Sequence, residues 1–396
     1  MTHATLRILV VHNRYLMPGG EDESFAAEVA LLRGQGHSVD TYVENNARIE
    51  SLGKVRTALR TIWSLETFTA VRLLIRDEKY DLVSVQNWFP LVSPSVYYAA
   101  RSMGVPVIQT LRNFRFMCVN GLFLRDGRVC ELCRGRTLAW PGIRYACYRD
   151  SHVASAVVAT TFALNRLVGT WSKVNAYVAL NDFVRDKYAE SGVPVERIVV
   201  KPNFLAEDPG RGDRSGGYAF LCGRLSREKG VDTAIESWKI LGPDAPPLKI
   251  AGSGPAFPSL QRESEGLPAI EWLGQLPHAD VIPRLQAARF LVFPSRWYEN
   301  FPRIILEALA CGVPVIASRL GAMAVLIRDG ETGLLFEPDN PRDLAEKVRW
   351  LCDHAVERDA MAQASRQEYL NHYTAEANYR AFQRIWMYVR NESTGR

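Results

Sequence analysis

A pattern of short β-rich runs separated by helical segments occurs twice along this chain, and it constrains the fold more than any other feature. The runs are bounded by Gly, Pro or Asn, and such alternation is typical of parallel βαβ units. The sequence therefore predicts an α/β protein with two doubly wound, Rossmann-like halves of similar length. The first series comprises residues 7–13, 81–87, 105–110, 176–180 and 197–200, and the second comprises residues 218–222, 248–252, 270–274, 290–294 and 313–317.

Helices are expected between these strands. After the first strand, Phe25, Val29 and Leu32 follow helical spacing from a start near Glu21, and Gly34 marks the end of the helix. This spacing predicts that one side of the helix packs on the sheet.

The segment 201–217 is rich in Gly, Pro and charged residues, and it is interpreted as the linker between the two domains. We expect the first domain to span residues 1–203, with a Cys- and Arg-rich insertion at 112–150. The second domain is expected to span 204–375, and a helix at 376–396 is expected to pack back on the first domain. Open α/β sheets bind ligands at the carboxyl ends of their strands, so the ligand is expected in a cleft between the domains.

Length and composition exclude several classes of protein. The 396 residues suffice for two or three domains of roughly 150 residues each. A content of 47% hydrophobic and 23% charged residues excludes disordered and collagen-like chains. The longest apolar run, from Val153 to Leu164, is shorter than the roughly 18 residues of a membrane span. The chain start lacks a signal-peptide layout and the seven cysteines are odd in number, so a cytoplasmic protein is expected.

Positive charge is concentrated in residues 101–150. This block holds nine Arg residues against Asp126, Glu131 and Asp150, and it carries +6 where the whole chain carries +5. A partner with phosphate groups and a solvated basic loop are both consistent with this pattern.

The most informative segment is E-N-F-P-R-I-I-L-E-A-L-A-C-G-V-P-V-I-A, residues 299–317, which follows a predicted strand. Proline is tolerated in the first turn of a helix, so a helix is expected to start at Phe301 and Pro302. Glu299 then lies in the loop and Glu307 inside the helix. A helix N-terminus binds anions, and a carboxylate beside it can bind sugar or ribose hydroxyls.

The loop C-G-R-L-S-R-E-K-G, residues 222–230, follows the first strand of the second series. Its Arg224 and Lys229 are predicted to neutralise a diphosphate without a divalent metal and to stabilise a departing nucleoside diphosphate. A third loop with Gly252 and Gly254 would let backbone approach a ligand, although this spacing is also typical of an ordinary βα turn.

With these motifs, the sequence resembles the retaining glycosyltransferases of the GT-B fold, family 4, which use nucleotide-sugar donors. The likeness covers essentially the whole chain and is strongest over residues 220–338. The E-x₇-E pair, the G-R-x₄-K-G loop and the G-x-P-V-I-A segment of that family occur here in the same order, at Glu299 and Glu307, at 223–230 and at 312–317. The resemblance implies a GT-B fold whose two domains face each other across a cleft, the first on the acceptor side and the second binding the nucleotide sugar.

The resemblance also implies roles for single residues. Arg224 and Lys229 would stabilise the diphosphate, and Glu299 would bind the transferred sugar. Glu307 would bind the donor ribose. Further donor contacts would come from the loop P-G-G-E at 18–21 and from the backbone of the other loops, at Gly19, Gly20, Gly223, Gly252, Gly254, Asn300, Phe301 and Pro302.

The chain departs from the family pattern at two positions. Family members often carry a His where Arg112 stands, and they usually carry a Glu where Val325 stands. A cation at Arg112 can contact a phosphate or a sugar hydroxyl, so Arg112 is included among the predicted catalytic residues. Nothing in the sequence replaces the charge absent at Val325.

The cysteines and one histidine allow more than one interpretation. The Arg-rich block contains C-x₁₁-C-x₂-C-x₁₃-C, which suits a structural four-thiolate zinc site, whereas buried unligated cysteines or a redox pair are the alternatives. His12, at the end of the first strand, is expected to be structural rather than to touch substrate. The four cysteines of the pattern are Cys118, Cys130, Cys133 and Cys147, and the three expected to fill the core are Cys222, Cys311 and Cys352.

The predicted function is retaining hexosyl transfer from a UDP- or GDP-linked sugar to an acceptor hydroxyl, in the synthesis of a cell-surface polysaccharide or glycoconjugate. No nucleophile is evident, so front-face attack without a catalytic divalent metal is expected. A sugar-nucleotide epimerase on the same fold is one alternative. A zinc-containing nucleic-acid-binding module is another, but it leaves the loops of the second domain unexplained, and no nucleic acid is expected as partner.

A glycan or a lipid-linked molecule is the expected acceptor. Residues 54–76 mix Lys and Arg with Trp, Leu and Phe along what is interpreted as one helix. Such a helix suits the anionic headgroups of a membrane, and it places the protein peripherally at the inner membrane face. A helix that covers the sheet would show a similar apolar stripe.

Overall fold

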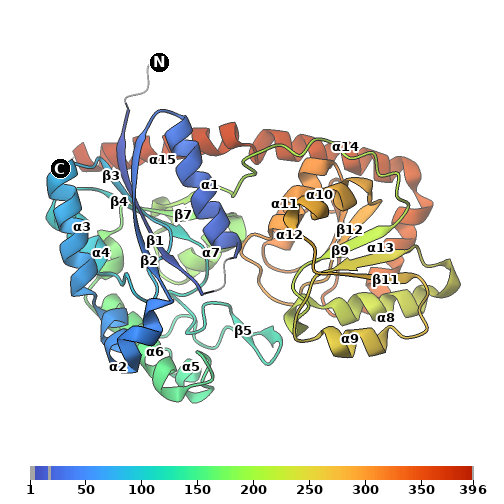
Figure 1. Ribbon diagram of the computed structural model, residues 1–396, viewed down its shortest axis with the longest axis horizontal. Helices are drawn as coiled ribbons and strands as arrows, with labels where there is room; N and C mark the ends of the chain where they lie inside the picture. The colour runs from blue at the N-terminus through green and yellow to red at the C-terminus, as the bar shows by residue number, and fades with distance from the viewer. Residues whose placement is uncertain (1–4, 17–18, 395–396) are drawn as a thin grey trace. The chain divides into compact units, whose positions relative to one another are not determined.

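The computed structural model describes residues 5–16 and 19–394, with side chains up to residue 392 (Figure 1). Contacts between residues divide the chain into two compact units. The first contains Met1–Phe123, Cys130–Asn203 and Asn378–Arg396, and the second contains Leu124–Val129 and Phe204–Ala377. Each unit holds a six-stranded sheet in which all pairs of neighbouring strands are parallel. The predicted α/β class with two Rossmann-like domains is confirmed.

The sheet of the first unit has the strand order β2-β1-β3-β4-β7-β8. Five of its strands follow the predicted runs, whereas β2 was not predicted. β2 lies at the edge of the sheet and leaves most of its side chains exposed or half-buried, so it lacks the apolar run that marks a central strand. The strands are β1 (Arg7–Arg14), β2 (Ser38–Asn45), β3 (Leu82–Val85), β4 (Val107–Leu111), β7 (Ala176–Ala179) and β8 (Ile198–Val200).

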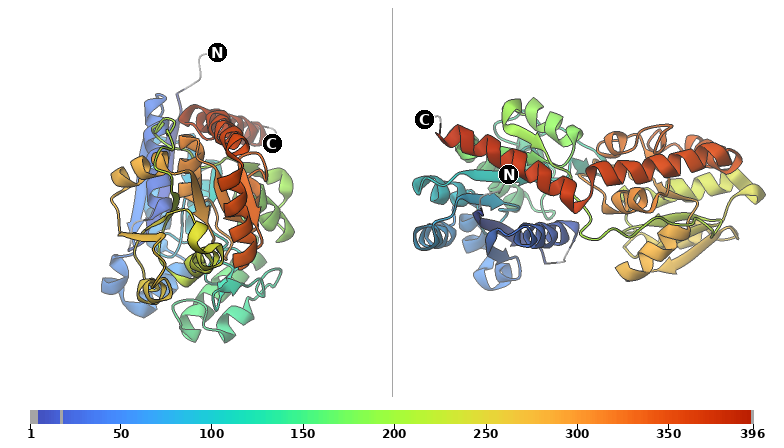
Figure 2. Two further views of the ribbon diagram at one scale, coloured as in Figure 1. Left: turned by 90° about the vertical axis from the view of Figure 1, so that its right-hand side faces the viewer. Right: turned by 90° about the horizontal axis from the view of Figure 1, so that it is seen from above.

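Two helices cover one face of this sheet: α1 (Gly20–Gly34) and α15 (Ala375–Thr394), which runs along the first unit in Figure 2. Ile8 and Val10 of β1 pack in one cluster with apolar side chains of both helices. Leu9 and Val11 are equally buried, and they point to the opposite face because side chains alternate along a strand. The sheet is therefore covered on both faces.

Residues 54–76 do not form the single helix that the sequence suggested. They are divided between α2 (Arg48–Ile62) and α3 (Leu65–Glu78). The Ser64 side chain accepts a hydrogen bond from the Thr67 amide and caps the start of α3. Trp63 has extended backbone angles and ends α2. The prediction of one continuous helix was wrong because a local capping hydrogen bond starts a new helix at Ser64.

The Arg-rich insertion contains little regular structure. Its hairpin of β5 (Leu124–Arg125) and β6 (Arg128–Val129) belongs to the second unit by its contacts, whereas α5 (Trp140–Arg144) belongs to the first. The other helices of the first unit are α4 (Ser95–Ser102), α6 (His152–Leu167), α7 (Asp182–Glu190) and the short η1 (Thr170–Lys173) and η2 (Val195–Arg197).

The sheet of the second unit has the strand order β11-β10-β9-β12-β13-β14. One apolar cluster, with α8 and α13, covers one face, and another, with α10, α11, α12 and α14, covers the opposite face. The strands are β9 (Ala219–Cys222), β10 (Leu248–Ala251), β11 (Ile270–Gly274), β12 (Phe290–Phe293), β13 (Val315–Ser318) and β14 (Gly333–Phe336). The helices are η3 (Arg227–Lys229), α8 (Val231–Leu241), η4 (Gly242–Asp244), α9 (Phe257–Glu263), α10 (His278–Ala287), α11 (Arg303–Cys311), α12 (Met323–Leu326), α13 (Pro341–Asp353) and α14 (Ala355–His372).

Within the described part of the chain, no helix combines the length and the apolar character that crossing a membrane requires.

Candidate active site

The strand order of the second sheet determines where its ligand site can form. The chain passes from β9 to β10 on one side and later returns to β12 on the other side of β9. In open α/β sheets, ligands bind at the carboxyl ends of the strands where the order reverses in this way. The loop after β9 carries Arg224 and Lys229, and the loop after β12 carries Glu299. Topology thus brings together loops that are about 70 residues apart in sequence.

Three side chains hold the Glu299 carboxylate in place. Lys229 Nζ lies 2.6 Å from Glu299 Oε1, and Ser295 Oγ and Trp297 Nε1 donate to the same oxygen over 2.9 and 2.8 Å. Glu299 is buried, so these donors fix its orientation rather than leaving it to solvent. Ser295 and Trp297 were not predicted; both lie in the same loop as Glu299.

Gly230 explains how the first loop reaches the second. Its φ is +66°, and a Cβ at this position would collide with the carbonyl oxygen of Pro294 at the end of β12. The backbone after Lys229 therefore packs directly on the backbone before Glu299. This close approach brings Lys229 within ion-pair distance of Glu299.

The second carboxylate of the pair, Glu307, lies on α11 and is also buried. Its Oε1 accepts from Arg303 Nε over 2.9 Å and lies 2.8 Å from His278 Nε2. Neither partner was predicted. Arg303 stands four residues before Glu307 on the same helix, so helical spacing could have identified it. His278 begins α10 and reaches Glu307 only through the tertiary fold.

Glu307 also raises the pKa of two cysteine thiols, Cys222 and Cys311. Burial, with a smaller contribution from the Glu307 carboxylate, raises the pKa of Cys222 to about 11. Burial and, to a smaller extent, Glu307 raise the pKa of Cys311 to about 12. Both thiols therefore stay protonated near neutral pH and are poor nucleophiles.

Arg224 is exposed, and within the described residues its side chain forms no hydrogen bond or ion pair. Its loop is fixed by the glycine loop after β10, because the Leu225 amide donates to the Ser253 carbonyl over 2.9 Å. A Cβ at Gly252 or Gly254 would collide with the backbone carbonyls of this Arg224 loop. The two glycines thus let the loop after β10 pack closely against the loop that carries Arg224.

A helix follows Glu299 as predicted, but it begins at Arg303 rather than at Phe301 and Pro302. Pro302 is the N-cap of α11, and Arg303 is its first residue. Asn300 and Phe301 lie in the preceding loop, with the Phe301 ring 6.0 Å from that of Tyr373. The first amides of a helix have no partner within the helix, so this end of α11 can receive an anion beside Glu299.

In the first unit, the N-terminus of α1 follows β1 at the reversal of strand order. Gly19 is the N-cap and Gly20 the first residue, and the Asp22 carboxylate accepts from the Gly19 amide over 3.2 Å. Asp22 also lies 2.9 Å from His12 Nε2. His12 is fully buried and stacks on Phe25, and burial lowers its pKa. Pro18, part of the same predicted loop, lies outside the described residues.

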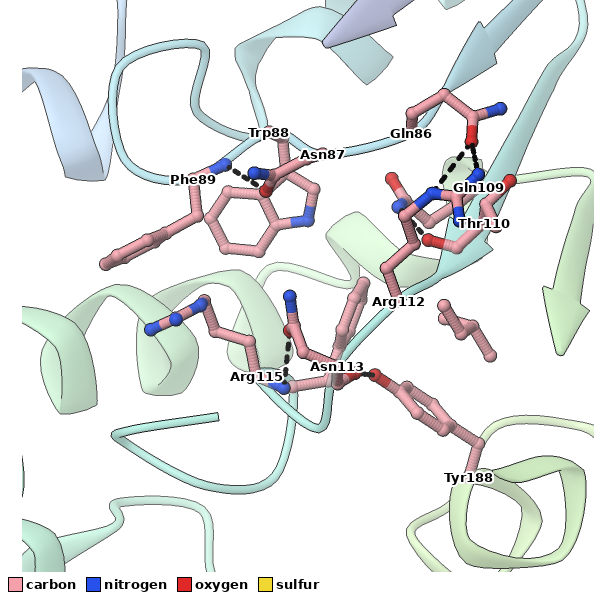
Figure 3. Close-up of a pocket in the computed structure, with 12 residues that line it drawn as sticks. Gln86, Asn87, Trp88, Phe89, Gln109, Thr110, Arg112, Asn113, Arg115 and Tyr188 are labelled. Atoms are coloured by element: carbon pink, nitrogen blue, oxygen red, sulfur yellow. Dashed lines mark hydrogen bonds between the residues drawn. The ribbon is translucent and has the colours of Figure 1, made fainter. Parts of the chain in front are cut away.

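A small pocket opens where β3 and β4 end (Figure 3). Residues 86–89, 109–113, 115 and 116 line it together with Tyr188 of α7, whose hydroxyl donates to the Asn113 carbonyl over 2.6 Å. The Arg115 guanidinium lies 4.0 Å from the centre of the Phe89 ring. The pocket thus combines aromatic faces with amide and guanidinium groups.

The two departures from the family pattern have different surroundings. Arg112 is buried, and two of its nitrogens donate to Gln86 Oε1 over 3.0 and 2.6 Å (Figure 3). It also donates to Asn203 over 3.2 Å, and Glu28 lies 3.7 Å away. Its catalytic role stays a prediction. Val325, on α12, is exposed, and nothing in the structure explains the loss of charge there.

The four cysteines of the insertion do not support the zinc interpretation. Among the described residues, no group of three or more His, Cys, Asp or Glu side chains is arranged to hold a metal ion. The Cys118 thiol donates to Asn120 Oδ1 over 2.9 Å within its own loop. Burial, with smaller contributions from the other three thiols, raises the pKa of Cys133 to about 11. None of the four forms a disulfide. Two thiols in C-x₂-C spacing do not by themselves orient two more toward a common metal ion.

The protein has two doubly wound domains, and the second carries a paired carboxylate motif and a cationic loop at its switch point. These features define a GT-B type of glycosyltransferase. Two family models agree: "Glycosyl transferase 4-like domain" matches residues 14–203, and "Glycosyl transferases group 1" matches residues 213–368. The chain belongs to the GT-B glycosyltransferases of family 4 type.

Individual relatives are more distant. The chain is 30% identical to the glycogen synthase of Mycobacterium tuberculosis over 262 residues, which is 58% of this chain and 61% of the relative. It is 27% identical to the D-inositol 3-phosphate glycosyltransferase of Acidothermus cellulolyticus over 72% of this chain and 64% of the relative. The matched part spans between 20 and 61% of the first three curated relatives.

Solved structures share the fold. The Anabaena protein Alr3699/HepE in complex with UDP is similar with a TM-score of 0.69 and 16% identity, over 96% of this chain and 99% of that one. A glycosyltransferase from Rickettsia africae reaches a TM-score of 0.70 at 16% identity, over 98 and 99% of the two chains.

Proposed function

We propose that the protein transfers a sugar from a nucleoside-diphosphate sugar to an acceptor hydroxyl, with retention of the anomeric configuration. The observation that carries this proposal is the convergence of Lys229, Ser295 and Trp297 on Glu299 at the switch point of the second domain. Membership of the GT-B family supports it. Complexes of the Anabaena relative contain UDP and UDP-glucose, so a UDP-linked hexose is the first donor to test and a GDP-linked one the second.

The donor would bind the second domain through its charged parts. Lys229 and the exposed Arg224 would contact the diphosphate, together with the first amides of α11. Glu307 would accept hydrogen bonds from the ribose hydroxyls, since His278 and Arg303 orient its carboxylate. Glu299, held at Oε1, would accept from a hydroxyl of the transferred sugar through Oε2.

Transfer would proceed on one face of the sugar. The bond between the anomeric carbon and the diphosphate oxygen breaks, and its electron pair leaves with the diphosphate. The acceptor oxygen bonds to the same carbon from the same side, and the departing phosphate oxygen takes the proton of the acceptor. Lys229 and Arg224 stabilise the charge that develops on the leaving group, so no divalent metal is required.

The acceptor would bind the first domain. At the pocket of Figure 3, the half-buried Asn113 side chain would offer hydrogen bonds to acceptor hydroxyl groups. The Trp88 and Phe89 rings are buried, so they would support this loop rather than stack on a sugar. Arg112 would orient Gln86 at the edge of this pocket. Relatives named for glycogen synthase and lipopolysaccharide galactosyltransferase activity support a role in building a polysaccharide or glycoconjugate.

The test is a panel of UDP- and GDP-sugars, screened first by thermal shift and then by product analysis. We expect one donor to raise the melting temperature. With an acceptor, we expect a glycoside whose anomeric configuration matches that of the donor by NMR. Glu299→Gln should abolish product while Glu331→Gln, an exposed carboxylate of the same domain, should not. A new sugar nucleotide formed without acceptor would identify an epimerase and overturn the proposal, as would an inverted product.

A further inference from the structure

Helix α6 carries apolar residues on both of its faces, although its buried face also includes Ser155, Thr161 and Asn165. One face is buried in the first unit through Val158, Ala159 and Phe162. The other face repeats apolar residues at intervals of three and four, and Thr160 is its one polar member among the described residues. A helix on the surface of a soluble domain normally presents polar residues to water, so this face indicates an interaction. Its exposed apolar members are Val153, at 76% exposure, Leu164, at 43%, and Leu167, at 71%.

Helix α2 extends this face. It packs against α6, and both lie at the same end of the first unit as α5 (Figure 1). Val55 and Leu59 of α2 are exposed, and Trp63 follows at the end of the helix. The Trp63 ring lies 5.1 Å from that of Tyr98, whose hydroxyl is 2.9 Å from Thr170 Oγ1 just beyond α6. We call the exposed side chains of Val55, Leu59, Trp63, Val153, Leu164 and Leu167 the α2–α6 surface.

Cations surround this surface and acids are few. Lys54 and Arg56 flank Val55 on α2, and both are exposed. Between residues 136 and 173 the chain has four Arg and one Lys against a single acid, Asp150. Trp140 and Tyr145 of the α5 region are also exposed, with Arg136 5.3 Å above the Trp140 ring. Exposed aromatics beside cations are typical of the boundary between a bilayer and water.

We infer that the α2–α6 surface docks the protein on an anionic phospholipid bilayer. A second copy of the chain would cover the apolar residues, but it would bring a like-charged rim against this one. A bilayer with anionic lipid satisfies both observations, because the apolar side chains enter the acyl boundary and the basic residues remain at the phosphate level. The docking goes beyond the proposed transferase activity and does not depend on it. Only its consequence, a lipid-linked acceptor, rests on that activity.

The surface differs from the one that the sequence suggested. Of the predicted segment, only the α2 part contributes to it. On α3, Arg76 pairs with Asp77, and the Arg72 guanidinium lies 5.4 Å from the centre of the Phe68 ring. The other three apolar side chains come from α6, where the sequence showed only a run too short to span a membrane.

Co-sedimentation of the full chain with vesicles tests the inference. With vesicles of 30 mol% phosphatidylglycerol in phosphatidylcholine, we expect binding at low salt that weakens as salt rises. The double variant Leu164→Glu/Leu167→Glu should bind at least tenfold more weakly. Lys54→Gln/Arg56→Gln should lose about 25-fold, at about fivefold for each charge removed. Val356→Glu, which changes the exposed Val356 of α14 in the second unit, should bind like the parent chain.

Three results would overturn the inference. These are no binding to anionic vesicles at low salt, equal binding to pure phosphatidylcholine, and unchanged binding of both double variants. Self-association that is lost in the Leu164→Glu/Leu167→Glu variant would instead assign the surface to a second copy. Circular dichroism and the thermal shift with nucleotide check that the variants are folded. Because that shift reports on the donor site, failure of docking and failure of the proposed activity can be told apart.

Discussion

Replacing Lys229 by Ala tests the central cluster of the second domain. The substitution removes the charged donor 2.6 Å from Glu299 Oε1 and leaves the buried carboxylate with two neutral donors, Ser295 and Trp297. Removing one member of a fully buried ion pair costs about 3–5 kcal/mol. The Lys229 side chain is 23% exposed, so we expect a loss of about 1–3 kcal/mol. In a domain of this size that is a fall of about 2–4 °C in melting temperature per kcal/mol.

The same variant is expected to bind the nucleotide more weakly. A hydrogen bond to a charged group contributes about 1.5–3 kcal/mol, which corresponds to a roughly 10- to 150-fold higher Kd for the nucleoside diphosphate. Calorimetric titration measures the affinity, and thermal unfolding measures the stability. Lys239→Ala is the matched control, because Lys239 also forms a 2.6 Å ion pair in this domain, but with both side chains exposed. It should change stability by less than about 0.5 kcal/mol and leave affinity unchanged.

A double variant separates the two effects. Lys229→Ala/Glu299→Gln removes the unpaired charge together with its partner, so it should regain much of the stability that Lys229→Ala loses. Its affinity for nucleotide should remain low, because the cation that faces the diphosphate is still absent. Unchanged affinity and stability in Lys229→Ala would refute the assignment of this cluster to the donor. Equal stability of the single and double variants would refute the burial argument.

Four further predictions follow from the second domain. Glu307→Gln should weaken nucleotide binding about 10- to 100-fold by titration, whereas Glu331→Gln should leave it unchanged. Gly252→Ala should lower the melting temperature far more than Gly266→Ala. A Cβ at Gly252 collides with backbone, whereas a Cβ at Gly266 meets nothing within 4 Å. Equal melting temperatures of the two variants would contradict this packing argument. The pKa of Cys222 is raised to about 11, so the protonated thiol should contribute fully to the free energy of unfolding below the unfolded pKa of about 8.5. That contribution should be lost as the pH rises through 11. Alkylation of Cys222 at pH 8 should be slow, and it should be faster in Glu307→Gln. Turnover should survive a chelator, and complete loss of activity with the fold intact would refute metal-free transfer.

Much of the fold could be predicted from the sequence because parallel strands buried on both faces carry apolar runs. β1, β9 and β12 are of this kind, and their positions agree with prediction. β2 was missed because most of its side chains are exposed or half-buried, so it carries no such run. β14 was missed too, although its four residues are buried. The division of residues 54–76 into two helices was missed because the cap at Ser64 is a single hydrogen bond.

At the candidate site, too, some features could be predicted from the sequence and others could not. The spacing of Glu299 and Glu307, with Pro302 between them, predicted one carboxylate in a loop and the other on a helix, as observed. The partners of those carboxylates could not be predicted in the same way. His278 reaches Glu307 from a different helix, and no local pattern encodes that contact. The zinc interpretation failed for a related reason, because a spacing of cysteines does not specify where their side chains point.

By itself, then, the sequence determined the alternation of strands and helices, the positions of the charged loops at strand ends, and a family likeness carried by short motifs. These are local properties, because strand and helix periodicity and turn residues act within a few positions. Only the tertiary structure decided which loops meet, which donors hold Glu299, and which face of α6 remains exposed. α6 has apolar residues on its exposed side as well as on its buried side, so its apolar pattern alone did not determine which side would be buried. That choice depends on packing between segments far apart in the chain, and packing is a property of the whole fold.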